Sequence, residues 1–355
     1  MSQARIALVG TGWWATECHL PALKAHPTAR IVAICDLDAV KLQRAAEVFN
    51  VEKTYTDLDT MLADETLDGV MVATHHAAHF PVARACLEKG LHVFIEKPMT
   101  LYAAEARALV ELARARGREI VMGYNLNHSE FVIRARDIVG GGELGAVQYI
   151  SGLFSQSIYN LLSGDLADFT AKVHSPGAVY SDPVRSGGGH GHLQITHLAA
   201  LICFITGLRV SRVQGLMAKH GLQVDLAAAI LAEFEGGALA NLGGTGNLPG
   251  GGRSCALTIT CERGWLTLDD ELGRLSIHRP GEAPEEHIRA GGSGSAYAYF
   301  APTHNFVDLI LGRAENHCGG VIGWRATELL DAAYRSAERD GAPIARQELY
   351  SEQKI

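Results

Sequence analysis

The chain has 355 residues, which exceeds the ~250–300 residues at which one hydrophobic core stops growing, so two domains are expected. Its net charge is −8 and no block of Lys and Arg occurs, which argues against nucleic acid or anionic membrane as a partner. No segment approaches ~20 uninterrupted apolar residues, and the short apolar run at the N-terminus lacks a signal-peptide cleavage site. The seven cysteines include no C-x-x-C pattern, which favours buried free thiols. The sequence therefore predicts a cytoplasmic protein.

Residues 1–125 alternate short apolar runs with amphipathic helical patterns. The runs expected to form strands are 5–10, 29–36, 68–74, 91–98 and 119–125. Because these runs are apolar on both faces, they indicate a parallel sheet that helices cover on both sides. We expect an α/β, doubly wound Rossmann domain over this region.

The pattern changes after Asn125. A helix is expected over 129–145, and the strands that follow lack regular crossover helices; they are predicted at 146–156, 210–219, 225–235, 238–244, 255–269 and 273–279. This spacing is typical of an α+β domain, over 126–355, with a mostly antiparallel sheet. Helices are also expected from His197 to Thr206 and over 324–340.

The stretch "GTGWWA" (10–15) directly follows the first predicted strand and opens a helix. Gly10 permits a sharp turn, and Gly12 lets the backbone approach a pyrophosphate that the helix N-terminus attracts. Asp36 ends the second strand, where a carboxylate accepts hydrogen bonds from a ribose diol and repels a 2′-phosphate. The pattern therefore favours NAD over NADP. In the alternative interpretation, the glycines only form a tight turn and Asp36 caps a helix.

Five neighbouring residues complete the cofactor prediction from the residues alone. Thr11, Trp13 and Trp14 belong to the glycine turn, and the sequence does not decide which tryptophan borders the pyrophosphate and which packs against the sheet. Thr74 and His75 end the third long strand and should lie near the cofactor.

Taken together, "GTGWWA", "CDLD" (35–38), "ATHHAAH" (73–79), "EKP" (96–98) and "GYN" (123–125) resemble the Gfo/Idh/MocA oxidoreductase family over nearly the whole chain. The resemblance implies a C-terminal domain with a large open sheet and a cofactor in the cleft between the domains. It also implies that Lys97 is catalytic or orients the substrate, that Glu96 contacts the nicotinamide ribose, and that His79 matches a family histidine. Without the other motifs, "EKP" would indicate only a turn with a solvated lysine.

The stretch "SGGGHGHLQITH" (186–197) allows three interpretations. A phosphate loop is disfavoured because no strand precedes it. A metal site is disfavoured because no Cys, Asp or Glu completes the set of His190, His192 and His197. The remaining interpretation is a turn that brings a histidine to the reaction, and we expect the glycines to approach the substrate closely.

By the family resemblance, the final histidine of this stretch is His197, and an aspartate usually stands four residues before it. Here that position is Leu193, so either His197 works alone or Gln194 or His190 substitutes for the carboxylate. A free imidazole has a pKa near 6.5 and an unperturbed lysine one near 10.4, so His197 is the better general base and Lys97 orients the substrate or relays the proton. The alternative for His197 is a hydrogen-bonded core histidine.

Asn125, at the end of the fifth strand, is a candidate to contact either the nicotinamide of the cofactor or the substrate. Tyr180 is a further substrate candidate, in a segment that is otherwise interpreted as a solvated loop. His174 and Arg185 lie in the same segment. The predicted function is NAD-dependent oxidation of a secondary hydroxyl of a sugar, polyol or glycoside, without a metal. Two alternatives stay open, namely glycoside cleavage through transient oxidation with tightly bound NAD, and a non-catalytic NAD-bound sensor. An exposed open sheet favours a homodimer or homotetramer.

Overall fold

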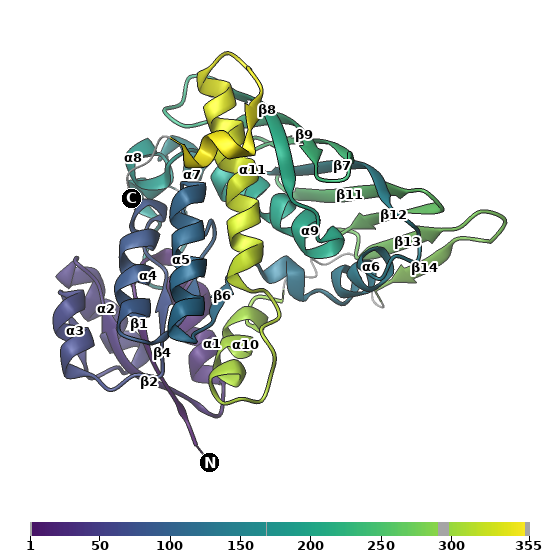
Figure 1. Cartoon of the computed structure of the whole chain (residues 1–355). Helices are drawn as coiled ribbons and strands as arrows, with labels where there is room; N and C mark the ends of the chain where they lie inside the picture. The colour runs from purple at the N-terminus through teal and green to yellow at the C-terminus, as the bar shows by residue number, and fades with distance from the viewer. Residues whose placement is uncertain (1, 168, 290–297, 352–355) are drawn as a thin grey trace.

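The computed structural model describes residues 2–167, 169–289 and 298–351, which form two β-sheets with helices packed around them (Figure 1). Within these residues, no helix is long and apolar enough to cross a membrane. All seven cysteines are buried and unpaired, as the sequence predicts.

The first sheet, sheet A, has six parallel strands in the order β3-β2-β1-β4-β5-β6. Its strands are β1 (Ala4–Val9), β2 (Ala29–Cys35), β3 (Thr54–Tyr55), β4 (Gly69–Val72), β5 (His92–Ile95) and β6 (Ile120–Met122). The helices between them are α1 (Leu20–Ala25), α2 (Ala39–Phe49), α3 (Leu58–Asp64), α4 (His79–Glu88) and α5 (Ala103–Arg116). This is the predicted doubly wound domain.

Alternate residues of the sheet A strands pack into two separate apolar clusters, because successive strand side chains point to opposite faces. Ala7 and Val9 of β1 belong to the cluster that contains residues of α4 and α5, whereas Ile6 and Leu8 belong to the cluster that contains residues of α1 and α2. Burial on both faces explains why these strands are continuously apolar in the sequence.

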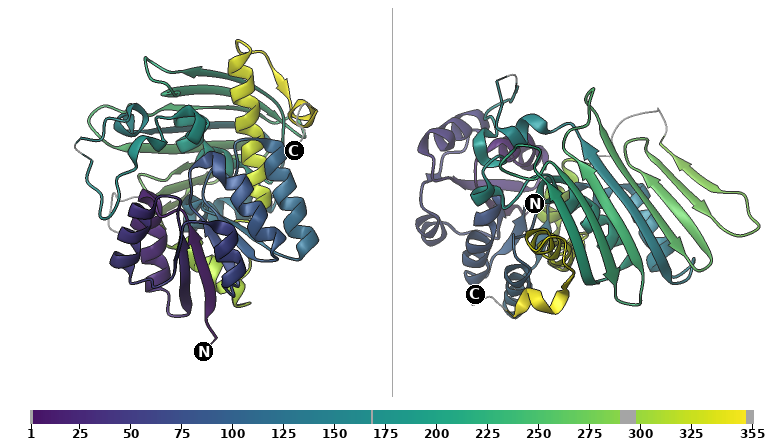
Figure 2. Two further views of the ribbon diagram at one scale, coloured as in Figure 1. Left: turned by 90° about the vertical axis from the view of Figure 1, so that its left-hand side faces the viewer. Right: turned by 90° about the horizontal axis from the view of Figure 1, so that it is seen from above.

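The second sheet, sheet B, has nine strands in the order β14-β13-β12-β11-β7-β10-β9-β8-β15, and only the β7–β10 pair is parallel. The strands are β7 (Val147–Gln156), β8 (Val210–Ala218), β9 (Ala227–Phe234), β10 (Leu239–Thr245), β11 (Arg253–Cys261), β12 (Gly264–Asp269), β13 (Arg274–His278), β14 (Glu285–Ile288) and β15 (Ile344–Ala345). Figure 2 shows these strands spread side by side next to sheet A and its helices. The predicted open, mostly antiparallel sheet is confirmed.

One face of sheet B is covered by helices and the other is open. The covering helices are α6 (Glu130–Gly140), α9 (Thr196–Thr206) and α11 (Gly320–Glu338), and the short helices α7 (Tyr159–Ser163) and α8 (Pro183–Ser186) lie between β7 and α9 in the sequence. The open face exposes Leu153, Leu216 and Leu231 to between 47% and 62%. Burial of this face in a homodimer or homotetramer stays a prediction.

The last helices return to sheet A, which the sequence did not indicate. Phe306, on α10 (Ala301–Ile310), is fully buried with its ring centroid 5.9 Å from that of Phe94 on β5. A Cβ on Gly69 of β4 would lie 2.7 Å from the same ring, so this glycine makes room for α10. Helix α11 runs between α5 and β8 and carries Asp331, whose carboxylate accepts a hydrogen bond of 2.9 Å from the Ala103 amide. The division into residues 1–125 and 126–355 stays a prediction, and α10 and α11 pack across it (Figure 1).

Candidate active site

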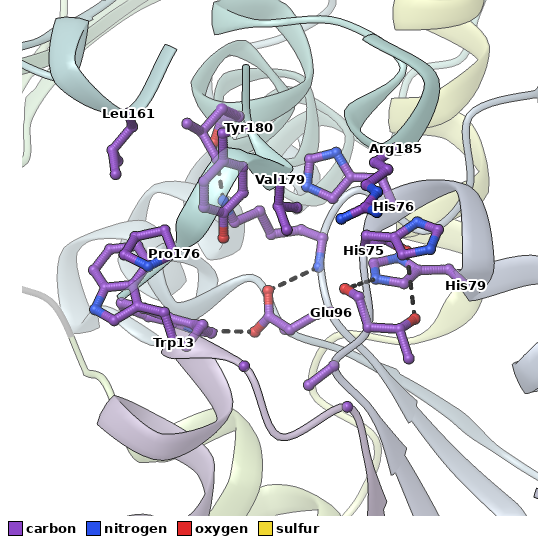
Figure 3. Close-up of a pocket in the computed structure, with 18 of the residues that line it drawn as sticks. Trp13, His75, His76, His79, Glu96, Leu161, Pro176, Val179, Tyr180 and Arg185 are labelled. Carbon is purple, nitrogen blue, oxygen red and sulfur yellow. Dashed lines mark hydrogen bonds between the residues drawn. The ribbon is translucent and has the colours of Figure 1, made fainter. Parts of the chain in front are cut away.

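A cleft of about 960 Å³ lies between the two sheets and receives residues from both halves of the molecule. Of the sequence-predicted residues, those that line it are Gly10, Gly12, Trp13, Trp14, Asp36, Thr74, His75, His79, Glu96, Lys97, Asn125, Tyr180, Gln194 and His197. Figure 3 shows Glu96 facing Tyr180 across this cleft, with His75, His76 and His79 to one side.

The glycine turn has the geometry that a dinucleotide requires. Gly10 has φ of +92°, and a Cβ there would lie 2.6 Å from the Ala73 carbonyl oxygen, so no other residue fits the turn. A Cβ on Gly12 would meet nothing within 4 Å, so Gly12 leaves open space over the start of the helix. Together these positions fit a pyrophosphate laid against the backbone.

Asp36 is held in place at the end of β2. Its Oδ2 accepts hydrogen bonds from the Thr11 amide at 2.6 Å and the Thr11 hydroxyl at 3.0 Å, and its Oδ1 accepts one from the Asp38 amide at 2.9 Å. Thr11 itself does not line the cleft, so it positions Asp36 instead of facing the cofactor. The carboxylate fits the diol of an adenosine ribose.

Glu96 is buried at the floor of the cleft, where Trp14 and His19 contact its carboxylate. Its Oε1 accepts from the Trp14 indole at 3.2 Å and lies 2.9 Å from His19 Nε2, and His19 Nδ1 lies 3.0 Å from the Thr303 hydroxyl. Burial alone would raise the pKa of Glu96, but the hydrogen bond and charge of His19, with the nearby Lys97, hold this pKa below its usual value. A Cβ on Gly123 would lie 2.5 Å from the same Oε1, so that position must be glycine.

His79 connects the end of β4 to the segment that carries Lys97. Its Nδ1 lies 2.8 Å from the Pro98 carbonyl oxygen and its Nε2 lies 3.2 Å from that of Thr74. The Lys97–Pro98 peptide is cis. A neutral imidazole donates to only one carbonyl oxygen, so His79 has one hydrogen bond and one further contact to these two backbone segments.

Lys97 is partly buried and reaches across to the other half of the molecule. Its Nζ donates a 3.0 Å hydrogen bond to the carbonyl oxygen of Leu193, at the position where the family pattern has an aspartate. Leu193 lies in a π-helical turn, Gly191–Ile195, a rare geometry that is frequent at functional sites. Burial lowers the pKa of Lys97, and the charge of Glu96 opposes this shift. The backbone of Leu193, and not a side-chain carboxylate, therefore accepts the hydrogen bond from Lys97.

His197, near the start of α9, is buried beside Lys97 and lines the cleft. Its ring stacks on Phe154 with centroids 5.9 Å apart and meets Tyr124 edge-on at 5.8 Å. Burial, together with the positive charges of Lys97 and Arg253, holds the pKa of His197 well below its usual value. The imidazole is therefore neutral near pH 7, which is the state that a general base needs.

Two family models match this chain. The N-terminal model of the GFO/IDH/MocA family, described as an oxidoreductase family with an NAD-binding Rossmann fold, matches residues 4–124. The GFO/IDH/MocA C-terminal domain model matches residues 132–267. This chain belongs to the GFO/IDH/MocA oxidoreductase family. Residues 4–124 form its NAD-binding domain.

Three proteins illustrate the likeness. The D-xylose 1-dehydrogenase [NADP(+)] of Haloarcula marismortui is 27% identical over 44% of this chain and 45% of its own length. The inositol 2-dehydrogenase of Salmonella paratyphi B is 28% identical over 42% of this chain and 45% of its own length. The matched stretch thus spans less than half the length of these relatives. A solved structure of levoglucosan dehydrogenase with NADH and levoglucosan shares the fold, with a TM-score of 0.81, 17% identity, and coverage of 97% of this chain and 99% of that one.

Two glycines of the "SGGGHGHLQITH" stretch pack closely against distant parts of the chain. A Cβ on Gly189 would lie 2.0 Å from the Asp225 carbonyl oxygen, and one on Gly188 would lie 2.4 Å from the Tyr334 hydroxyl. These glycines do not line the cleft, so the expectation that they approach the substrate is wrong. The Asp225 carboxylate accepts hydrogen bonds from the Gly189 and Gly191 amides at 2.6 and 2.8 Å, which fixes the turn.

The other two histidines of the stretch point away from the reaction. His190 Nε2 lies 2.9 Å from the Phe154 carbonyl oxygen, and His192 stacks on Tyr334 with centroids 4.3 Å apart. Neither lines the cleft, so His190 does not replace the family aspartate. In the described ranges, no group of three His, Cys, Asp or Glu residues is placed to hold a metal.

The cleft also contains residues that sequence reasoning missed. His76 lines it and is anchored by a 2.8 Å contact from Nδ1 to the Ser186 carbonyl oxygen. Arg253 lines its sheet B end and pairs with Asp270 at 2.5 Å and Glu271 at 3.0 Å. Arg253 follows the glycine run at 250–252 and begins β11, and nothing in that local pattern distinguishes it from an ordinary loop residue.

Residues 172–186, which end with α8, cross the side of the cleft that Gly12 and Asp36 line. The Lys172 amide donates a 2.6 Å hydrogen bond to the Glu17 carboxylate, and His174 Nε2 lies 3.0 Å from the Lys41 carbonyl oxygen. Pro176, Val179 and Tyr180 of the same segment line the cleft (Figure 3). We call residues 172–186 the strap, because they bind the nucleotide domain at Glu17, Lys41 and His76.

Proposed function

We propose that this protein is an NAD-dependent oxidoreductase that oxidises a secondary hydroxyl of a sugar, polyol or glycoside. The observation that carries the proposal is the meeting of Lys97 and a neutral His197, from opposite halves of the molecule, in the cleft that Gly12 and Asp36 also line. When bound, NAD supplies the hydride acceptor for the carbinol carbon.

The two central side chains have complementary roles in this proposal. Lys97 Nζ uses one N–H on the Leu193 carbonyl and has further N–H bonds to donate to the substrate oxygen. The imidazole of His197 takes the hydroxyl proton, and a charged Lys97 stabilises the developing alkoxide. Glu96, held by His19 and Trp14, fixes the turn that carries Lys97.

The amide side chains of the cleft support a polyhydroxylated substrate. Asn125 Oδ1, Gln156 Oε1 and Gln194 Oε1 are buried and have no hydrogen-bond partner among the described residues. A buried acceptor without a donor destabilises the protein by about 1–3 kcal/mol. Substrate hydroxyls and the cofactor carboxamide are donors that match these oxygens.

We propose NAD as the preferred dinucleotide. Asp36 and Asp38 place two carboxylates where the ribose would lie, and Leu37 between them is 89% exposed and offers no charge to a 2′-phosphate. Lys41 lines the same region but lies 3.8 Å from Asp38, which offsets its charge.

The strap gives specific support to a second candidate, redox-neutral glycoside cleavage with retained NAD. Its three contacts to the nucleotide domain lie across the side of the cleft that the dinucleotide would fill. A retained cofactor suits a reaction that oxidises the sugar only transiently.

One experiment distinguishes the two candidates. The protein is incubated with a panel of sugars and glycosides and a molar excess of NAD or NADP, and NADH absorbance and released aglycone are both followed. NADH formation in proportion to consumed sugar supports the dehydrogenase, and a higher kcat/KM with NAD than with NADP supports the cofactor preference. Aglycone release without NADH accumulation supports cleavage. If no compound of the panel gave NADH or released aglycone, and no label exchanged between substrate and cofactor, the sensor alternative would remain.

A further inference from the structure

The substrate end of the cleft has one mainly apolar wall. Ile158, Leu161 and Leu193 line the cleft and belong to one apolar cluster, in which Leu162, Val224 and Leu226 support them from behind. We call the first three residues the apolar wall. Figure 3 shows Leu161 on the Tyr180 side of the cleft, across from Glu96.

The apolar wall begins at the reacting position itself. The backbone of Leu193 accepts the 3.0 Å hydrogen bond from Lys97 Nζ, so a substrate bound to Lys97 lies next to this residue. Ile158 follows the end of β7, whose last residue, Gln156, also lines the cleft. A group attached to the substrate therefore meets polar and apolar surface on different sides.

The polar side consists of Gln156, Gln194 and Arg253. The two amide oxygens are buried acceptors without a partner in the described part of the chain. Arg253 is paired across the strand register with Gln156 and lies close enough to His197 to lower the pKa of that imidazole. These groups suit the hydroxyls of a sugar ring.

The charges around the cleft do not favour an anionic substrate. Arg253 is ion-paired with both Asp270 and Glu271, Lys97 has Glu96 beside it, and Arg185 lies 3.4 Å from Asp182. Each of these three cations thus already has a carboxylate partner. An added carboxylate or phosphate on the substrate would have to compete with that partner for the cation.

From these observations we infer that the substrate is an uncharged glycoside whose sugar ring contacts Gln156, Gln194 and Arg253, and whose apolar aglycone lies on the apolar wall. This inference rests on the proposed function and narrows its substrate class. Apolar contact with the wall gives affinity without direction, while the amide and guanidinium groups orient the ring toward Lys97 and His197.

The test compares three matched substrates: the methyl glycoside, the phenyl glycoside and the phenyl uronide of the same sugar configuration. We expect kcat/KM for the phenyl glycoside to exceed that for the methyl glycoside by about tenfold to a hundredfold, the effect of burying about 100 Å² more apolar surface. The phenyl uronide should be at least tenfold poorer than the phenyl glycoside.

Two variants localise the effect. Leu161→Ser places a hydroxyl in the apolar wall and should lower the ratio of kcat/KM for the phenyl glycoside to that for the methyl glycoside toward one. Leu166→Ser is the matched control, because Leu166 packs on the same cluster but does not line the cleft. That control should keep the preference.

Calorimetric titration of the glycosides into the NADH-bound protein separates this inference from the proposed function. If the phenyl glycoside bound no more tightly than the methyl glycoside, or if Leu161→Ser and Leu166→Ser behaved alike, the apolar wall would not be a substrate surface. If the phenyl glycoside bound more tightly, and Leu161→Ser abolished this, while no substrate was oxidised, the wall would stand and the dehydrogenase proposal would fall.

Discussion

The nucleotide side and the substrate side of the cleft are built in different ways. On the nucleotide side, Gly10, Gly12 and Asp36 follow directly after strands of one parallel sheet, and short local contacts such as Thr11–Asp36 fix them. On the substrate side, Lys97 meets the Leu193 carbonyl across 96 positions of sequence, and Gln156 meets Arg253 only through the pairing of β7 with β11.

This difference separates the side of the cleft that family members share from the side that varies among them. The dinucleotide is the same small set of groups in every family member, so a fixed local backbone geometry is enough to bind it. The substrate surface depends on side chains that the tertiary fold brings together, and single substitutions there change its chemistry. The three predictions below each act on one side and leave the other intact.

The largest effect is expected from His197→Ala. Removing the imidazole leaves the nucleotide side unchanged, so kcat should fall by about 10²–10⁴-fold while the affinity for NAD persists. Steady-state kinetics and a fluorescence titration with NADH measure the two quantities separately. Unchanged turnover would remove His197 from the mechanism, and a parallel loss of NADH binding would show that the two sides are not independent.

The nucleotide side should respond to Gly12→Ala with weaker NAD binding. The added methyl group has open space in the protein but occupies the surface that the pyrophosphate approaches, so we expect at least a tenfold weaker affinity with an unchanged melting temperature. Gly10→Ala is the contrasting variant. Its Cβ would clash with the Ala73 carbonyl at φ of +92°, so it should lower the melting temperature as well. If Gly12→Ala and Gly10→Ala changed NAD affinity and melting temperature alike, the distinction between a pyrophosphate-facing Gly12 and a turn-forming Gly10 would be wrong.

The smallest effect concerns pH. An imidazole with a pKa near 6.5 would be about 90% protonated at pH 5.5, and kcat/KM would fall about tenfold there. Because burial and the charges of Lys97 and Arg253 lower the pKa of His197, its neutral form persists at lower pH, and we expect less than a twofold fall between pH 7 and 5.5. A limb centred near 6.5 in the pH profile of kcat/KM would contradict this expectation.

The same contrast explains what the sequence could predict. The strand–turn–helix context of "GTGWWA" predicted the glycine turn from neighbouring residues alone, although contacts that fix it, such as that of Thr11 with Asp36, join more distant positions. The glycines at 187–189 and His190 could not be interpreted in the same way, since their partners Asp225, Tyr334 and Phe154 come from distant segments. Arg253 and the apolar wall gave no local signal, because their proximity to Lys97 arises only when sheet B pairs.

Helix α10 has a consequence for how the chain is made. Phe306 and Val307 belong to the same core cluster as β1, so one face of the sheet that is translated first lacks part of its cover until residue 307 has left the ribosome. A shortened product that ended at residue 125 would lack the ring of Phe306 that packs on Phe94. The nucleotide domain thus receives its full apolar cover only after most of the residues of sheet B have been synthesised.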